Sequence, residues 1–112
     1  MSSEQFIDYA SGKTAKIAFK RAVDEALYDC GHAGYTGTIA EKDCFVMIPI
    51  PIELKAVYDG LAKGKTIPLG DVEDYIYHLF ENEDKRIDDK WGPAGCMKIG
   101  PENFVFFGYA SS

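Results

Sequence analysis

Residues 14–48 read TAKIAFKRAVDEALYDCGHAGYTGTIAEKDCFVMI, and the pattern changes twice along them. From Ala15 to Cys30 apolar residues recur at steps of three and four, which predicts an amphipathic helix. Thr14 is a suitable N-cap, and Gly31 is a suitable residue to end the helix. Because four of the inner residues are alanines, we expect this helix to lie flat on a sheet.

The opposite face of this helix carries a second strip. At about 100° per residue, Ile17, Arg21 and Tyr28 fall together beside Asp24. Single apolar residues are common on protein surfaces, so this strip is either ordinary surface or a contact with another chain. Since Tyr and Arg are enriched in interfaces, we treat Ile17, Arg21 and Tyr28 as a candidate interface of a homo-oligomer.

A glycine-rich segment follows, with glycines at 31, 34 and 37. Such a density indicates a sharp turn or the close approach of a ligand, and backbone N–H groups in such turns can bind anions. The segment leaves a helix C-terminus, whose dipole opposes an anion, so binding would need a protonated His32 or a lysine such as Lys42. A purely structural connection and a ligand-binding loop both remain open.

Composition limits the classes of function. The chain has 112 residues, of which 46% are hydrophobic, and we expect one globular domain over residues 1–112. The net charge of -6 disfavours binding to nucleic acids or to anionic membranes. The cysteines, Cys30, Cys44 and Cys96, form no CxxC pair, and we expect reduced, mostly buried thiols.

Targeting signals are not evident in the sequence. The first residues lack the basic start and apolar run of a signal peptide, and Phe45–Ile52 is too short to span a bilayer. We therefore expect a cytoplasmic protein.

Residues 11–14, Ser-Gly-Lys-Thr, end like a phosphate-binding P-loop. Ile7 replaces the required first glycine and we expect no strand before the segment, so we reject that motif.

The remaining pattern alternates between strands and helices. Residues 38–40 and 44–48 predict a hairpin, and the second strand is apolar on both faces, which is typical of a central strand or an interface. Helices are predicted over residues 53–63 and 72–80, the latter capped by Asp71. His78 lies outside the apolar stripe of that helix, and we expect it at the surface rather than in a site.

The last third of the chain contains the only tryptophan, Trp91, in a turn-rich segment. Its ring either fills the core or stacks on a planar ligand such as a nucleobase. Residues 96–99 and 104–110 predict a second hairpin, whose last strand is aromatic on both faces. The predicted fold class is therefore α+β, with about four mainly antiparallel strands in one sheet packed by about three helices.

Three segments of the chain resemble small bacteriophage-encoded proteins of unknown function: residues 31–42, the turn 91–95 and the terminal residues 106–110. The resemblance implies expression in an infected bacterial cytoplasm. Small phage proteins often modulate host machinery or defence, so it also implies a stoichiometric binder rather than a metabolic enzyme.

Our hypothesis is a non-enzymatic binding protein that self-associates and holds a host protein or a small nucleotide-like ligand. The alternative is a small enzyme that uses His32 with a nearby carboxylate on a nucleotide-like substrate. The sequence predicts no cofactor and no metal site. The candidate ligand-binding residues lie between the glycine-rich segment and the tryptophan: His32, Gly34, Tyr35, Thr36, Gly37, Thr38, Lys42 and Trp91.

Overall fold

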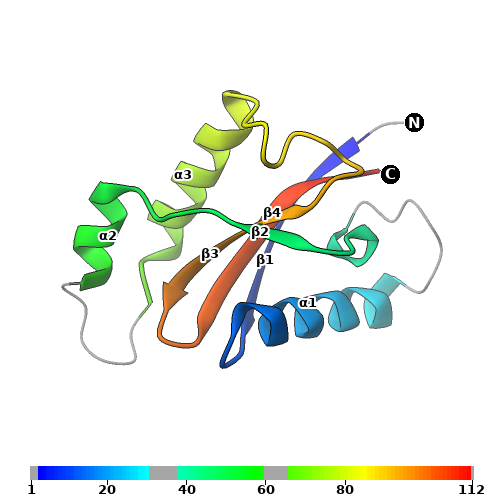
Figure 1. The fold of residues 1–112 in the computed structure, drawn as a ribbon, viewed down its shortest axis with the longest axis horizontal. Helices are drawn as coiled ribbons and strands as arrows, with labels where there is room; N and C mark the ends of the chain where they lie inside the picture. Colours follow the sequence, from blue (N-terminus) through cyan, green and yellow to red (C-terminus); the bar gives the residue numbers. More distant parts are fainter. Residues whose placement is uncertain (1–2, 31–37, 60–65, 112) are drawn as a thin grey trace.

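The structure, a computed structural model, describes residues 3–30, 38–59 and 66–111 (Figure 1). In these ranges the strands are β1 (Ser3–Ser11), β2 (Phe45–Met47), β3 (Ala94–Gly100) and β4 (Asn103–Ser111). The helices are α1 (Ala15–Cys30), α2 (Ile52–Asp59) and α3 (Leu69–Glu81), with a short 3₁₀ helix, η1 (Ile39–Glu41). The predicted α+β class is confirmed.

The strands form one sheet in the order β1-β4-β3-β2. β4 pairs antiparallel with both β1 and β3, whereas β2 pairs parallel with β3. The sheet is therefore mixed rather than purely antiparallel. Its parallel edge follows from the connection between β2 and β3, which contains both α2 and α3, since parallel neighbours need a long crossover.

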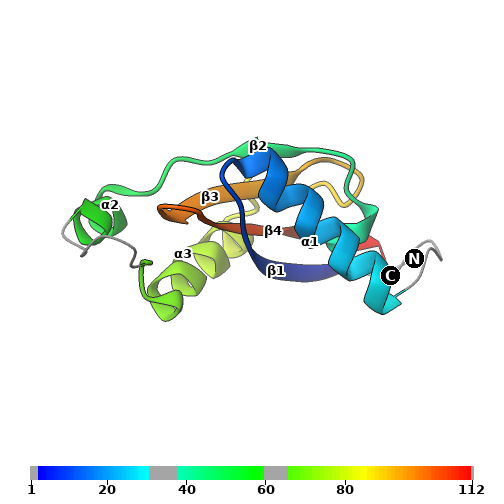
Figure 2. The same ribbon diagram turned by 90° about the horizontal axis from the view of Figure 1, so that it is seen from below.

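Helices cover both faces of this sheet (Figure 2). In β4 the side chains alternate between two core clusters: Phe104 and Phe106 pack on the α1 side, and Val105 and Phe107 pack on the α3 side. All four are buried. A strand with apolar side chains on both faces needs a packing layer on each side, and the predicted two-sided character of this strand is confirmed.

Helix α1 lies against the sheet through small residues, as predicted. Ala18 and Ala22 are buried, and the Phe19 ring packs 5.4 Å from the Phe106 ring centroid. The predicted cap is also confirmed, because Thr14 Oγ1 accepts a hydrogen bond of 3.2 Å from the Ile17 N–H. In contrast, Asp71 lies in the first turn of α3, whose N-cap residue is Pro68.

Two strand predictions were wrong. Residues 39–41 form η1 rather than a strand, because the Thr38 side chain accepts a hydrogen bond from the Ala40 N–H and caps a 3₁₀ turn. The predicted first hairpin is therefore absent, and β2 is an edge strand in which Met47 is 49% exposed.

Sequence reasoning also missed β1, so a strand does precede Gly12. The P-loop remains rejected because Ile7 still stands in place of its first glycine.

Within residues 3–30, 38–59 and 66–111, none of the helices combines the length and the apolar character needed to cross a bilayer.

Gly95 in β3 provides a test of the core packing. A Cβ at this position would lie 2.8 Å from the Ile87 and Phe107 side chains and 2.9 Å from that of Ile48. We expect Gly95→Ala to lower the free energy of unfolding by about 1–3 kcal/mol, because overpacking forces neighbours to move. Urea denaturation measures this loss.

The matched control is Gly70→Ala in α3, where a Cβ would meet no atom within 4 Å. This variant should be neutral or more stable by up to about 1 kcal/mol, because alanine favours helix. Equal effects of the two substitutions would contradict the packing described for β3.

Candidate functional site

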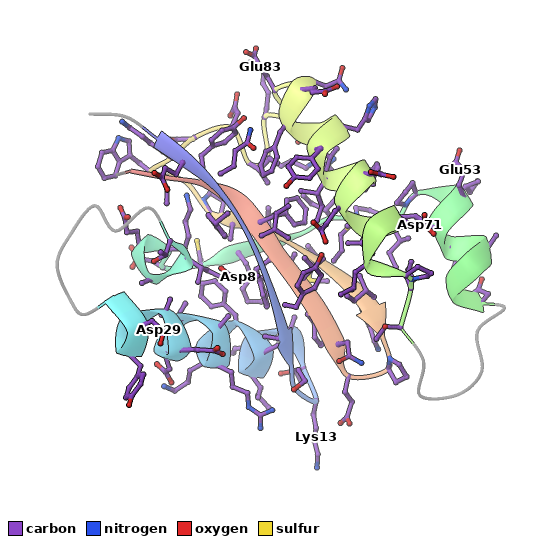
Figure 3. The ribbon with its side chains drawn as sticks, turned by 180° about the vertical axis from the view of Figure 1, so that it is seen from behind. Asp8, Lys13, Asp29, Glu53, Asp71 and Glu83 are labelled. Atoms are coloured by element: carbon purple, nitrogen blue, oxygen red, sulfur yellow. The ribbon has the colours of Figure 1, made fainter. Side chains whose placement is uncertain are left out.

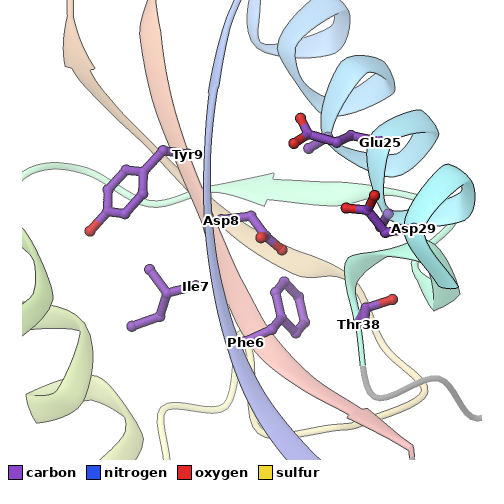
Figure 4. Close-up of a pocket in the computed structure, with 9 residues that line it drawn as sticks. Phe6, Ile7, Asp8, Tyr9, Glu25, Asp29 and Thr38 are labelled. Atoms are coloured by element: carbon purple, nitrogen blue, oxygen red, sulfur yellow. The ribbon is translucent and has the colours of Figure 1, made fainter.

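A hollow of about 320 Å³ lies between β1 and α1 (Figure 4). Its size is at the lower end of the range for ligand pockets, which suits a single side chain or a small molecule. Strand β1 places Phe6 and Asp8 on the α1 side of the sheet, and α1 contributes polar and small residues from the facing surface. The lining residues are Phe6, Ile7, Asp8, Tyr9, Ala22, Glu25, Ala26, Asp29 and Thr38.

Three carboxylates dominate the chemistry of this hollow. Asp8 projects from β1 toward α1, and Glu25 and Asp29 project from α1 toward β1 (Figure 4). Burial, and secondarily the charge of Glu25, raises the pKa of Asp8 above its ordinary value. Both effects disfavour the ionised form of Asp8. A cation bound in the hollow would offset the repulsion between the Asp8 and Glu25 carboxylates and would itself be attracted by them.

The placement of these acidic groups costs stability in the free protein. Glu25 and Asp29 are four residues apart on one helix, where like charges repel. Asp29 also lies in the last turn of α1, which contains no basic residue to balance the negative end of the helix dipole. Such unfavourable groups are typical of functional sites.

The cluster does not have the arrangement of a metal centre. In the part of the chain that the structure describes, no group of three or more His, Cys, Asp and Glu side chains could hold a metal ion. The hollow combines its carboxylates with the ring of Phe6 and two alanines of α1, Ala22 and Ala26. This combination suits an organic cation with an apolar stem, such as a lysine or arginine side chain.

The sequence-predicted ligand residues are only partly described. His32, Gly34, Tyr35, Thr36 and Gly37 lie outside the described residues, so their ligand role and the enzyme alternative based on His32 stay predictions. The remaining three residues occupy two places. Thr38 lines the acidic hollow, whereas Lys42 donates hydrogen bonds to the turn before β3, on which Trp91 lies.

Lys42 has a structural role in that turn. Its side chain is 4% exposed, and Nζ donates hydrogen bonds to the carbonyl oxygens of Asp89, Lys90 and Gly92 at 3.4, 3.0 and 2.9 Å. Burial lowers the pKa of Lys42, while the nearby charge of Asp89 opposes this shift. The three carbonyls use the three donors of an ammonium group, which leaves it little capacity to bind an anion.

Trp91 lies on this turn and is 61% exposed, so the interpretation of its ring as a core residue was wrong. Lys90 Nζ lies 5.5 Å from the centroid of the Trp91 ring.

Of the cysteines whose side chains are described, Cys96 is buried, and burial raises its pKa to about 12. Cys44 is exposed, contrary to the expectation of mostly buried thiols.

The candidate interface strip lies on the outer face of α1. Tyr28 is 90% exposed and Ile17 is also exposed. Arg21 is used within its own chain, because Nη1 donates a hydrogen bond of 2.9 Å to the Ser11 carbonyl oxygen. Self-association through this strip stays a prediction.

Sequence reasoning missed the acidic hollow. The one local signal was the spacing of Glu25 and Asp29, four residues apart beside the apolar stripe of α1. Asp8 could be added only by recognising β1 and its place beside α1. Searches for similar proteins give no further guide: no family model, no curated protein and no solved structure matches the chain.

The raised pKa of Asp8 predicts a pH-dependent effect of Asp8→Asn. Because the folded-state pKa lies above the ordinary value of 3.8, ionisation of Asp8 costs stability as the pH rises through the folded-state pKa. Asn cannot ionise, so we expect the variant to be more stable than the wild type at pH 7, with the difference shrinking as the pH falls below 3.8.

Urea denaturation at pH 7 and pH 3 measures this difference. Asp88→Asn, at an exposed aspartate, is the matched control and should have a smaller effect. A stability difference for Asp8→Asn that is the same at both pH values would show that the Asp8 carboxyl carries no burial cost.

Lys42→Met tests the role of the buried ammonium. The variant keeps the apolar stem but leaves three carbonyls without a donor, so we expect a loss of about 2–3 kcal/mol in the free energy of unfolding. The only tryptophan lies on the same turn, and its fluorescence anisotropy should fall as the turn loosens. Lys55→Met, at an exposed lysine paired with Asp59, is the control and should change stability by less than about 1 kcal/mol.

Proposed function

We propose that this chain is a non-enzymatic binding protein that recognises a basic region of a partner protein through the hollow between β1 and α1. The observation that carries the proposal is the convergence of Asp8, Glu25 and Asp29 on one hollow. A lysine or arginine side chain entering it would reduce the repulsion among these groups. The apolar part of the guest side chain would contact Phe6.

The charge of the whole molecule supports the same partner. The chain carries 18 acidic against 12 Lys and Arg residues, and this excess attracts basic surfaces over distances of about a Debye length, ~8–10 Å in physiological salt. Phosphate groups would be repelled. Of the two ligand classes expected from the sequence, a host protein fits the described hollow better than a nucleotide-like molecule does.

The proposed biological setting rests on the resemblance to phage-encoded proteins. If the chain is made in an infected bacterium, the partner would be a host protein that presents a lysine or arginine at its surface. Binding without turnover would then block or recruit that protein, which is a stoichiometric role.

Agmatine, which carries a guanidinium and an ammonium but no peptide backbone, is a direct probe of the hollow. In a titration followed by ¹H–¹⁵N NMR, we expect the largest amide shifts at Asp8, Glu25 and Asp29. The double variant Glu25→Gln/Asp29→Asn should weaken binding by roughly tenfold or more, since two nearby charges lost in a solvated site are worth about 1 kcal/mol each.

The control variant Glu81→Gln/Asp88→Asn makes the same change in net charge on exposed residues outside the hollow. Its affinity for agmatine should remain within about twofold of the wild type, because distant exposed charges are screened. If both double variants weaken binding equally, agmatine responds to net charge alone and the hollow is not the recognition site.

A further inference from the structure

In residues 3–30, 38–59 and 66–111, the outer edge of β1 carries main-chain groups with no strand beside them. Among the strands of these residues, β1 is the end strand of the sheet and pairs on one side only, with β4 (Figure 3). The Gly12 N–H donates to the Glu102 carbonyl oxygen at 3.0 Å, in continuation of the β1–β4 register. Antiparallel pairs bond at alternate residues, so the even-numbered residues of β1 bond to β4 and the odd-numbered ones point away.

The odd-numbered residues in the middle of β1 are therefore available for pairing. The β1–β4 register turns the main-chain N–H groups of Ile7 and Tyr9 away from β4, and outside the sheet ladder none of the hydrogen bonds of the described residues involves them. The outward direction of this set agrees with Ser11, whose carbonyl oxygen accepts a hydrogen bond from Arg21 of α1. Groups of this kind form a template for another extended chain.

The acidic hollow lies along this same edge. Four consecutive residues, 6–9, line it, although side chains in a strand alternate between the two faces. Phe6 and Asp8 point to the α1 side, and Ile7 and Tyr9 point to the opposite side (Figure 4). A hollow that contacts four consecutive residues of β1 runs along this strand, and an added strand would lie along the edge of β1 away from β4.

Tyr9 also lines a second hollow of about 320 Å³, which lies on the α3 side of β1. It is lined by the exposed side chains of Tyr9 and Leu69, and the Tyr9 hydroxyl donates a hydrogen bond of 3.0 Å to the Glu73 carboxylate beside it. An extended guest segment would therefore meet three carboxylates on the α1 side, and on the α3 side the large side chains of Tyr9 and Leu69 with the single carboxylate of Glu73. The two surfaces together specify a guest in which basic and apolar residues alternate.

Charge decides between a second copy of this chain and a different protein. Self-pairing of β1 would bring Glu4 and Asp8 of one copy toward the same acidic residues of the other, and like charges on paired strands are destabilising. A basic segment would instead place its cations beside Asp8, Glu25 and Asp29.

We infer that the edge of β1 binds an extended segment of the partner as an added β-strand, with a lysine or arginine of that segment seated in the hollow between β1 and α1. This inference rests on the proposed function and adds the backbone pairing to it. The main-chain hydrogen bonds would supply affinity, and the alternating side chains would supply selectivity.

Amide hydrogen exchange measured by NMR tests the pairing directly. In the free protein, the Ile7 and Tyr9 amides should exchange fast and those of Asp8 and Ala10 slowly, because only the even-numbered set bonds to β4. The probe is the peptide acetyl-TVKVKVT-amide. At saturation, exchange at Ile7 and Tyr9 should slow at least about tenfold, because these amides gain hydrogen bonds.

Three further peptides separate the contributions of charge and backbone. Replacement of both lysines by glutamate should abolish binding. Two singly N-methylated peptides carry the methyl group on the central valine or on one lysine, and these nitrogens face opposite edges of the guest strand. One of the two should lose at least about tenfold in affinity and the other should bind as the parent does, because a single guest edge pairs with β1.

Tyr9→Pro removes an outward-facing N–H from β1, and Tyr9→Ala is the matched control because it removes the same side chain but keeps the N–H. We expect the proline variant to bind the lysine peptide at least about tenfold more weakly than the alanine variant. If Tyr9→Pro does not fold, the N-methylated peptides and the exchange rates still give the answer.

The outcomes distinguish the inference from the proposed function. Binding that needs Glu25 and Asp29 but is insensitive to N-methylation, with Ile7 and Tyr9 still in fast exchange, overturns strand addition and retains the cation hollow. Slow exchange at Ile7 and Tyr9 in the free protein also overturns the inference, since the edge would already be covered. If the peptide still slows exchange at the Ile7 and Tyr9 amides of the Glu25→Gln/Asp29→Asn variant, strand pairing is retained and the hollow is rejected as the site of the guest lysine.

Discussion

The fold depends on the burial of β4 from both sides. Phe104 and Phe106 require one apolar layer and Val105 and Phe107 require another, and no single helix could cover both. Helix α1 with its buried alanines forms the first layer, and α3 forms the second. Each face then needs only one apolar stripe per helix, which is what the sequence supplies.

This constraint explains which parts of the fold could be predicted. The two-sided apolar pattern of residues 104–110 and the helical periodicity of residues 15–30 are strong local signals, and both were interpreted correctly. β1 gave no such signal, because the polar Asp8 interrupts its apolar run and its pairing partner lies at the far end of the chain. At Thr38 the β-branched residues suggested a strand, but a side-chain cap produced a 3₁₀ turn instead.

The candidate site was less predictable than the fold for the same reason. Local sequence reasoning favours residues that are adjacent in the chain, and it selected the glycine-rich segment and Trp91. The acidic hollow joins Asp8 to Glu25 and Asp29 only through the packing of β1 beside α1. Lys42, which the sequence placed among the candidate ligand residues, donates hydrogen bonds to three backbone carbonyls, and this role depends on a turn almost fifty residues further along the chain.

The pairing of β1 with β4 also constrains how the molecule is made. The two strands that form the longest ladder are separated by almost the whole described chain, so that Ser11 lies opposite Asn103. During synthesis on the ribosome, β1 therefore waits without its neighbour until the last strand has emerged. The acidic residue in its centre is well placed to keep the waiting strand soluble and to discourage premature association with other nascent chains.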